Sequence, residues 1–137
     1  MRVNRSMPEA QVIAELVYPD VNTAAEWLCR AFGFAVRLRI ASHRIQLTFG
    51  AGAVILRSGA VMAEACGAHS VMVRVENIDA HYARAVAAGA TVSGEPTTYP
   101  YGERQYGARD LAGHEWVFSE SVDDVHPNQW GGTLVSE

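Results

Sequence analysis

The side chains that could take part in catalysis are few and widely spaced. The five histidines occupy positions 43, 69, 81, 114 and 126, and the two cysteines are Cys29 and Cys66. No two histidines have the i, i+4 spacing of a zinc-binding helix, and the cysteines are too far apart for a Cys-x-x-Cys pair. No Ser/His/Asp arrangement is recognisable along the chain. The sequence therefore contains no self-contained catalytic motif.

All eleven basic residues are arginines, because the chain contains no lysine. This composition excludes Schiff-base chemistry at lysine and the phosphate-binding loop that requires one. Fifteen acidic residues give a net charge of -4, which argues against a nucleic-acid surface or a polybasic membrane patch. We therefore expect no nucleic acid among the partners.

The chain has 137 residues, of which 49% are hydrophobic. A single domain of this size buries a sizeable core without disulfide bonds. Residues 1–10 lack the apolar stretch of a signal peptide, and no run reaches the roughly 18 apolar residues of a membrane span. Two cysteines alone do not suggest secretion. We expect a cytoplasmic protein with no membrane partner.

The first half of the chain follows the order strand, helix and three strands. A β-branched run over residues 11–18 ends at Pro-Asp and predicts a strand. Residues 23–33 predict a helix, because Thr23 and Glu26 form a capping box and Gly33 ends the apolar periodicity. Three more strands are predicted over residues 34–41, 44–49 and 53–57.

The second half repeats this order. A shift of 56 positions carries Thr23 onto Asp79. The same shift carries Gly33 onto Gly89, so the two helices share their end signals. Such self-similarity indicates two copies of one structural unit. The second set of predicted elements is a helix over residues 79–89 and strands over residues 71–75, 91–95, 104–110 and 114–119.

These patterns divide the chain into segments. Residues 1–10 form an N-terminal extension and residues 121–137 a C-terminal tail. Between them, residues 11–120 form one domain. The tail's composition fits an ordered loop or short helix anchored by Trp130, and a frayed terminus is the alternative. Within the domain, unit one covers residues 11–58, a Gly/Ala-rich linker residues 59–68, and unit two residues 69–120.

The chain resembles the vicinal oxygen chelate superfamily, which includes glyoxalase I, bleomycin-resistance proteins, fosfomycin-resistance enzymes and extradiol dioxygenases. The resemblance rests on the two tandem β-α-β-β-β units, the phrase AAEWLCRAFGF and the ending YGERQYGARDLAGHEWVFSES. It covers about residues 11–120. It implies an α+β fold in which two tandem βαβββ units form a cup-like, partly closed mixed β-sheet around a pocket. It also implies a homodimer.

Metal-using members of that superfamily hold a divalent ion with about four His or Glu side chains from the first and last strands of each unit. None of the matching side chains in this sequence is a usual metal ligand. We therefore expect no metal cofactor. The matching positions are Ile13 or Ala14, Leu56, Ser70 and Val117.

A displaced metal site is the alternative, with Glu15 and His69 as its candidate ligands. Each would need a one-residue slip in strand register to turn inward. Alternation opposes both slips, because Glu15 shares its parity with Ile13 and His69 shares its parity with Val71. Such a site would make the protein a divalent-metal-dependent lyase, isomerase or dioxygenase, in which the metal polarises adjacent substrate oxygens.

Polar and aromatic side chains on the predicted strands suit an organic ligand. An arginine in a pocket binds carboxylate or phosphate through paired hydrogen bonds, and aromatic rings supply stacking surface. The alternative for each is an ordinary place on a solvated strand face or in the core. Because side chains alternate along a strand, only one of Arg104 and Gln105 points into the pocket. Alternation does not decide between them, and Arg104 is the preferred candidate. The candidate ligand-binding residues are Arg37, Arg39, Gln46, Tyr99, Tyr101, Arg104, Tyr106 and Trp116.

The expected function is therefore that of a metal-free, bleomycin-resistance-like protein that binds a small organic ligand between its two units. The displaced-metal enzyme and a non-catalytic interaction module are the alternatives. Whether the protein catalyses a reaction is left open, because function resides in the site and not in the scaffold.

Overall fold

The computed structural model describes residues 2–135, and two similar units follow one another along them. The first unit contains β1 (Ile13–Tyr18), α1 (Val21–Phe32), β2 (Ala35–Ile40), β3 (Arg44–Phe49) and β4 (Gly52–Ser58). Its sheet has the strand order β1-β4-β3-β2, with β1 parallel to β4 and the other pairs antiparallel.

The second unit has the same plan. It contains β5 (Ser70–Arg74), α3 (Ile78–Ala87), β6 (Thr91–Val92), β7 (Thr97–Thr98), β8 (Glu103–Arg109) and β9 (Glu115–Ser121). Its sheet has the order β5-β9-β8-β6, with β5 parallel to β9, and β7 also pairs with β8. The expected α+β fold of two tandem βαβββ units is confirmed, and the two sheets are not closed into a barrel.

Three short elements within residues 2–135 lie outside this plan, and the sequence patterns did not predict the first two. A four-residue helix, α2 (Ala63–Cys66), interrupts the segment between the units. Strand β7 lies in the loop that precedes β8. A 3₁₀ turn, η1 (Pro127–Gln129), orders the tail, and the Trp130 ring packs edge-on against Tyr101.

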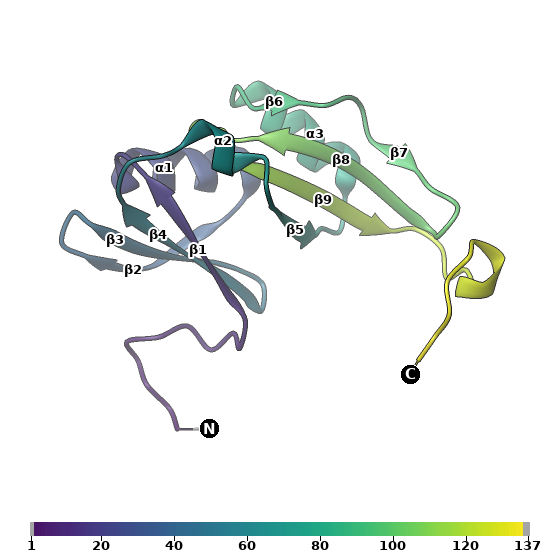
Figure 1. The fold of residues 1–137 in the computed structure, drawn as a ribbon, viewed down its shortest axis with the longest axis horizontal. Coiled ribbons are helices and arrows are strands. Elements are labelled where there is room, and N and C mark those ends of the chain that lie inside the picture. The colour runs from purple at the N-terminus through teal and green to yellow at the C-terminus, as the bar shows by residue number, and fades with distance from the viewer. Residues whose placement is uncertain (1, 136–137) are drawn as a thin grey trace.

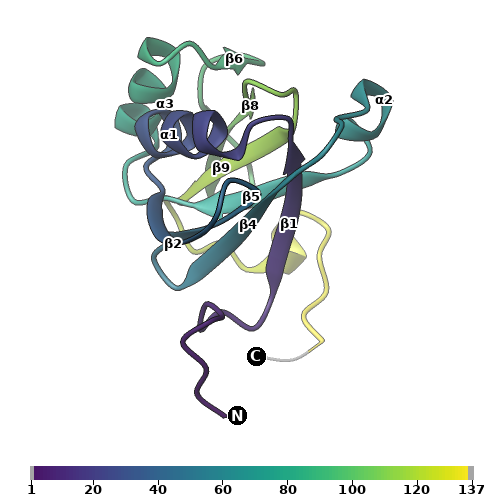
Figure 2. The ribbon, with the colours of Figure 1, turned by 90° about the vertical axis from the view of Figure 1, so that its left-hand side faces the viewer.

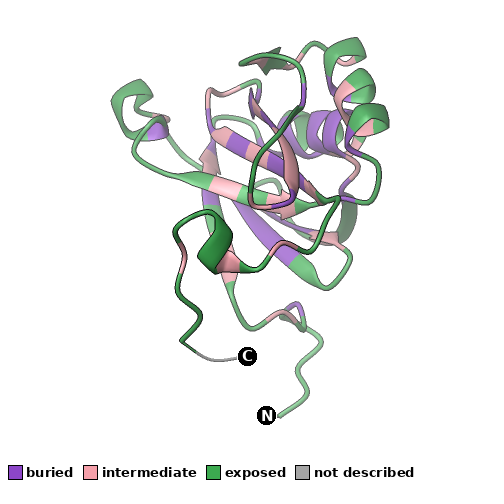
Figure 3. Cartoon of the chain, turned by 90° about the vertical axis from the view of Figure 1, so that its right-hand side faces the viewer, coloured by how far each residue is buried: buried purple, intermediate pink, exposed green. Residues whose placement is uncertain are grey.

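Helices α1 and α3 lie side by side and cover one face of each sheet, as Figures 1 and 2 show. The other face of each sheet, called here its open face, is covered by no α-helix of residues 2–135 and turns toward the side where both termini lie. Buried residues gather on α1 and the central strands in Figure 3, whereas the tail and outer turns are exposed.

Aromatic side chains join the two units into one core beneath the helices. The Phe32 ring, at the end of α1, lies with its centroid 4.7 Å from that of Phe118 and 5.4 Å from that of Trp116, both on β9. All three side chains are almost completely buried. Because the core is continuous, each unit covers apolar surface that the other would expose if alone.

The helix ends agree with the sequence patterns except at their first residues. The side chain of Asp20 accepts hydrogen bonds from the backbone N–H groups of Asn22 and Thr23, so α1 begins two residues before Thr23. Gly33 ends the helix in the left-handed conformation, as predicted. None of the helices within residues 2–135 has the length and apolar character that crossing a membrane requires.

Candidate functional site

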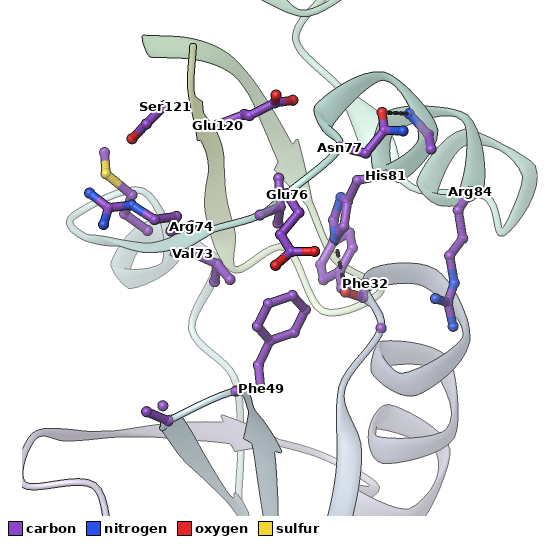
Figure 4. A pocket seen from close by; sticks show the side chains of 17 residues that line it. Phe32, Phe49, Val73, Arg74, Glu76, Asn77, His81, Arg84, Glu120 and Ser121 are labelled. Carbon is purple, nitrogen blue, oxygen red and sulfur yellow. Dashed lines mark hydrogen bonds between the residues drawn. The ribbon is translucent and has the colours of Figure 1, made fainter. Parts of the chain in front are cut away.

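A cleft of about 1170 Å³ lies between the two units. Its walls are the β3–β4 turn, strand β5, the segment that leads into α3, and the end of β9 (Figure 4). Ligand sites in proteins are commonly clefts of comparable size, with mostly apolar walls and a few polar groups. The position of this cleft depends on both units, because each supplies one side.

The apolar surface of the cleft comes from both units. Phe49, at the end of β3, projects its ring into the cleft, where Figure 4 shows it beneath Glu76. Val73 of β5 and Val75, just past its end, supply aliphatic surface, and Met72 lies at the edge with 63% of its surface exposed. This combination suits a flat aromatic or apolar group.

Most polar side chains around the cleft are already used in hydrogen bonds that hold the helices. Glu120 accepts a hydrogen bond of 2.8 Å from the backbone N–H of Ile78, and Asn77 caps α3 through the N–H of Ala80. Arg84 donates to the carbonyl oxygens that end α1. These groups shape the cleft, and each already uses part of its hydrogen-bonding capacity in the fold.

Two side chains of opposite charge remain available in the cleft. Arg74 ends β5 and Glu76 lies two residues further along the chain, and both are exposed. Among residues 2–135, neither side chain forms a hydrogen bond or ion pair with another residue. A ligand in the cleft therefore finds one guanidinium donor group and one carboxylate acceptor close to apolar surface.

His81 lies in the wall of the cleft as a neutral imidazole. Its Nε2 lies 2.9 Å from the carbonyl oxygen of Phe32, which only accepts, so Nε2 carries the proton. Its Nδ1 then accepts a hydrogen bond of 2.6 Å from the Tyr106 hydroxyl. Burial lowers the pKa of His81, which favours this neutral state. Both ring nitrogens are committed, so His81 acts as a bridge between the units.

Two of the sequence-predicted candidates lie together on the open face of the first sheet. The pairing of β2 with β3 shifts between Val36 and Leu38, and this bulge turns Arg37 toward the open face. Arg37 Nη1 donates a hydrogen bond of 2.6 Å to Oε1 of Gln46, whose side chain is buried. Arg39 lies beyond the bulge and donates instead to Asn22 of α1, on the opposite face.

Three candidates of the second sheet face the helix side and not the open face. Arg104 forms an ion pair of 3.0 Å with Asp79 of α3, so Gln105 is the residue that faces the open side. Tyr106 is buried against His81. Trp116 is buried and donates its indole N–H to a buried carboxylate in the core.

The remaining two candidates border the open face of the second sheet. Tyr99 and Tyr101 stack with their rings parallel to within 2° and their centroids 5.4 Å apart. The Tyr101 hydroxyl donates to Gln105, which in turn donates to Ser119. The structure thus brings Tyr99 and Tyr101 together, and it separates them from the pair formed by Arg37 and Gln46.

The residues on the open faces do not fit a divalent metal ion. Ile13, Ser70 and Val117 face the open side, but none carries a strong metal-binding group. The prediction that Leu56 occupies a metal-ligand position is wrong. Its side chain lies in the core under α1, and the neighbouring Ile55 faces the open side. No group of three or more His, Cys, Asp or Glu residues within residues 2–135 has the arrangement of a metal site.

The two alternative metal ligands, Glu15 and His69, lie in different surroundings. Glu15 lies on the open face of the first sheet and pairs with Arg44 at 3.5 Å. His69 is exposed at the start of the second unit, with its ring 6.3 Å from that of His114. A guanidinium beside Glu15 opposes binding of a cation there.

Sequence patterns missed the side chains of the cleft. Phe49, Arg74 and Glu76 lie at strand ends, next to turns, where alternation no longer tells which way a side chain points. The only available signal is that Glu76 and Asn77 directly precede a predicted helix, where polar residues are ordinarily explained by capping.

The fold and the cleft define the class of the protein. A family model described as Glyoxalase/Bleomycin resistance protein/Dioxygenase superfamily matches residues 10–118. The chain therefore belongs to this superfamily. A search of curated proteins finds no match.

Solved structures share this fold. TioX from Micromonospora sp. ML1, whose crystal structure is known, is 34% identical to this chain in sequence. The match has a TM-score of 0.71 and covers 82% of this chain and 98% of TioX. A lactoylglutathione lyase from Agrobacterium tumefaciens is 19% identical, with a TM-score of 0.64, over 91% and 98% of the chains. The fosfomycin resistance protein FosX from Mesorhizobium loti is 17% identical, with a TM-score of 0.65, over 83% and 93%. The last two show a shared fold.

Proposed function

We propose that the protein binds a small organic ligand in the cleft between its two units, without a metal ion. The observation that carries this proposal is the presence of Arg74 and Glu76, neither of which forms a hydrogen bond or ion pair within residues 2–135, beside apolar surface in a cleft of about 1170 Å³. Binding sites typically combine such apolar walls with a few polar groups that orient the ligand.

The chemistry of the cleft favours an aromatic molecule with an acidic group. An aromatic ring would pack on Phe49 and Val73, and a carboxylate would accept hydrogen bonds from the guanidinium of Arg74. Glu76 would accept a hydrogen bond from an N–H or O–H group of the same ligand. A purely apolar molecule would leave both charged groups without partners and would bind more weakly.

A homodimer is part of this proposal. Met72 lies at the edge of the cleft on the open face of β5, with 63% of its surface exposed. A second copy that covered this face would bury apolar surface and narrow the entrance to the cleft. Sedimentation equilibrium of the purified protein would report a species of twice the chain mass.

Titration with naphthalene-2-carboxylate, followed by amide chemical shifts in NMR spectra, tests the site. We expect shifts concentrated at residues 49–52 and 73–77, and weaker binding of the neutral naphthalene-2-methanol. Arg74→Ala should weaken binding of the carboxylate about tenfold, the value of one lost charge-assisted pair. Arg30→Ala, an exposed arginine on α1, is the matched control and should change nothing. Shifts confined to another region would contradict the proposal.

The metal-free part is tested separately. Exhaustive chelation should leave binding of naphthalene-2-carboxylate unchanged. Tight, stoichiometric binding of Zn²⁺ or Mn²⁺ in a calorimetric titration would overturn this part and favour the metal-dependent enzyme.

A further inference from the structure

The segment that precedes β1 lies on the open face of the first sheet. Arg37 Nη2 donates a hydrogen bond of 3.0 Å to the carbonyl oxygen of Arg5. The side-chain amide of Gln46 donates one of 2.8 Å to the carbonyl oxygen of Ser6. Pro8, two residues further on, is buried although residues 2–7 are exposed. Residues 5–8 are called here the strap.

The two residues that hold the strap are built for this contact. Only 2% of the surface of Gln46 is exposed, and a buried amide requires hydrogen-bond partners. Its Oε1 accepts from Arg37 and its Nε2 donates to the strap, so protein groups satisfy both ends of the amide while the strap is in place. The bulge in β2 places Arg37 where one guanidinium reaches both Gln46 and Arg5.

Beside these polar side chains, the face under the strap carries the apolar residues Ala53 and Ile55. Ile55 is 5% exposed and Ala53 is 9% exposed, although both face the open side, where no helix covers them. Ile55 pairs in register with Gln46, which holds the strap. Pro8 and Ala53 also line one shallow pocket together with Thr48. The strap therefore takes the place of a helix over this part of the sheet.

We propose that the strap is a releasable cover over the Ala53 and Ile55 part of the open face of the first sheet. Its attachment is weak enough to open reversibly, because it consists of two hydrogen bonds to backbone carbonyls and the burial of one proline. Release would expose a second apolar surface beside the cleft, with which it shares residues 50–52, and enlarge the space available to a ligand.

Proteolysis tests the attachment without any ligand. Trypsin cleaves after arginine, and the Arg5–Ser6 bond can enter the protease only when the strap is free. We expect this bond to be cut at least about tenfold more slowly in the protein than in a synthetic peptide of residues 1–12. The double variant Arg37→Ala with Gln46→Leu should be cut at nearly the peptide's rate, and Arg37→Ala alone at an intermediate rate.

Arg39→Ala is the matched control, because Arg39 lies on the same strand but contacts Asn22 on the opposite face. It should leave the rate unchanged. Thermal unfolding of each variant checks that the fold persists, and if the double variant unfolds, Arg37→Ala alone gives the answer. Equal rates in the native protein and the peptide, or the same rate in Arg37→Ala as in the native protein, would overturn the proposal.

The exposed surface is tested with the fluorescent probe 1-anilinonaphthalene-8-sulfonate. Deletion of residues 2–8 should raise bound-probe fluorescence severalfold above that of the native protein, and a synthetic peptide of residues 2–10 should reverse the increase. An unchanged signal after deletion would show that the strap covers no apolar face, and would overturn the proposal whether or not the cleft binds a ligand.

Discussion

The hydroxyl of Tyr18, at the end of β1, donates a hydrogen bond of 2.5 Å to Oδ2 of Asp110, in the turn between β8 and β9. This bond joins the two units in the protein interior. Asp110 also accepts from Trp116 Nε1 and from the backbone N–H groups of Ala112 and His114, each at 3.0 Å. Burial, together with the adjacent Asp110 carboxylate, raises the pKa of Tyr18, so the phenol stays protonated and acts as a donor.

Replacement of Tyr18 by phenylalanine should therefore destabilise the protein. Tyr18→Phe keeps the ring but removes a buried donor from Asp110, at a cost of about 1.5–3 kcal/mol in the free energy of unfolding. Tyr82→Phe is the control, because the Tyr82 ring packs edge-on against Tyr106 and its hydroxyl bonds to no other residue of the segment 2–135; its cost should be about 0.5 kcal/mol or less. Urea denaturation measures both, and equal costs would contradict the role assigned to Asp110.

The neutral state of His81 makes stability depend on pH. Its pKa in the folded protein lies below the ordinary value of 6.5, so the unfolded chain binds this proton more readily. The contribution of His81 to stability is thus complete above pH 6.5 and is lost as the pH falls from 6.5 toward the folded-state pKa. His81→Phe should reduce this slope and, at pH 7, lower stability by about 1–2 kcal/mol through loss of two hydrogen bonds. Unfolding curves from pH 5 to pH 8 provide the measurement, and an identical slope in the variant would refute it.

Arg84 caps the C-terminal end of α1 from the neighbouring helix. Its Nε donates to the carbonyl oxygen of Arg30 at 2.8 Å and its Nη2 to that of Cys29 at 2.9 Å. A cation at this end also interacts favourably with the helix dipole, so Arg84→Ala should cost about 1–2 kcal/mol. Arg30→Ala removes only an exposed contact with Glu26 at 4.0 Å and should cost less than about 0.5 kcal/mol. Similar melting temperatures for the two variants would contradict this prediction.

Gly102 is required by the close approach of the tail. It has a φ of +82°, and a Cβ there would lie 2.1 Å from the carbonyl oxygen of Asp123. Gly102→Ala should therefore cost about 2–4 kcal/mol or detach the tail, because both the backbone conformation and the contact resist a side chain. Gly50→Ala also places alanine at positive φ but in open space, so its cost should stay near 1 kcal/mol. Chemical denaturation and Trp130 fluorescence distinguish the outcomes.

The repeat of β-α-β-β-β patterns predicts the fold well, because strand alternation and helix end signals are local. Gly33 ends α1 as its position predicts, and the turn from Asp110 to Gly113 closes through a backbone hydrogen bond. The missed elements are short. Strand β7 has two residues, too few for any periodicity to show, and it exists because β8 offers a free edge.

The candidate site was less predictable, because its residues depend on departures from regular geometry. A bulge sends Arg37 and Arg39 to opposite faces, although strict alternation places them on one. Arg104 turned toward Asp79, a partner 25 residues away that no local pattern identifies. The strap is held through its backbone carbonyl oxygens. Every residue type has this group, so the sequence does not indicate which residues use it.

The two helices complete one another's ends. Trp27 of α1 donates its indole N–H to the carbonyl oxygen of Ala88, just past α3, while Arg84 and His81 of α3 donate to carbonyl oxygens at the end of α1. Either unit, if produced alone, would lose the donors that the other unit supplies to carbonyl oxygens at or just past the end of its helix. The two units thus depend on one another, and heating should melt both together in one calorimetric transition.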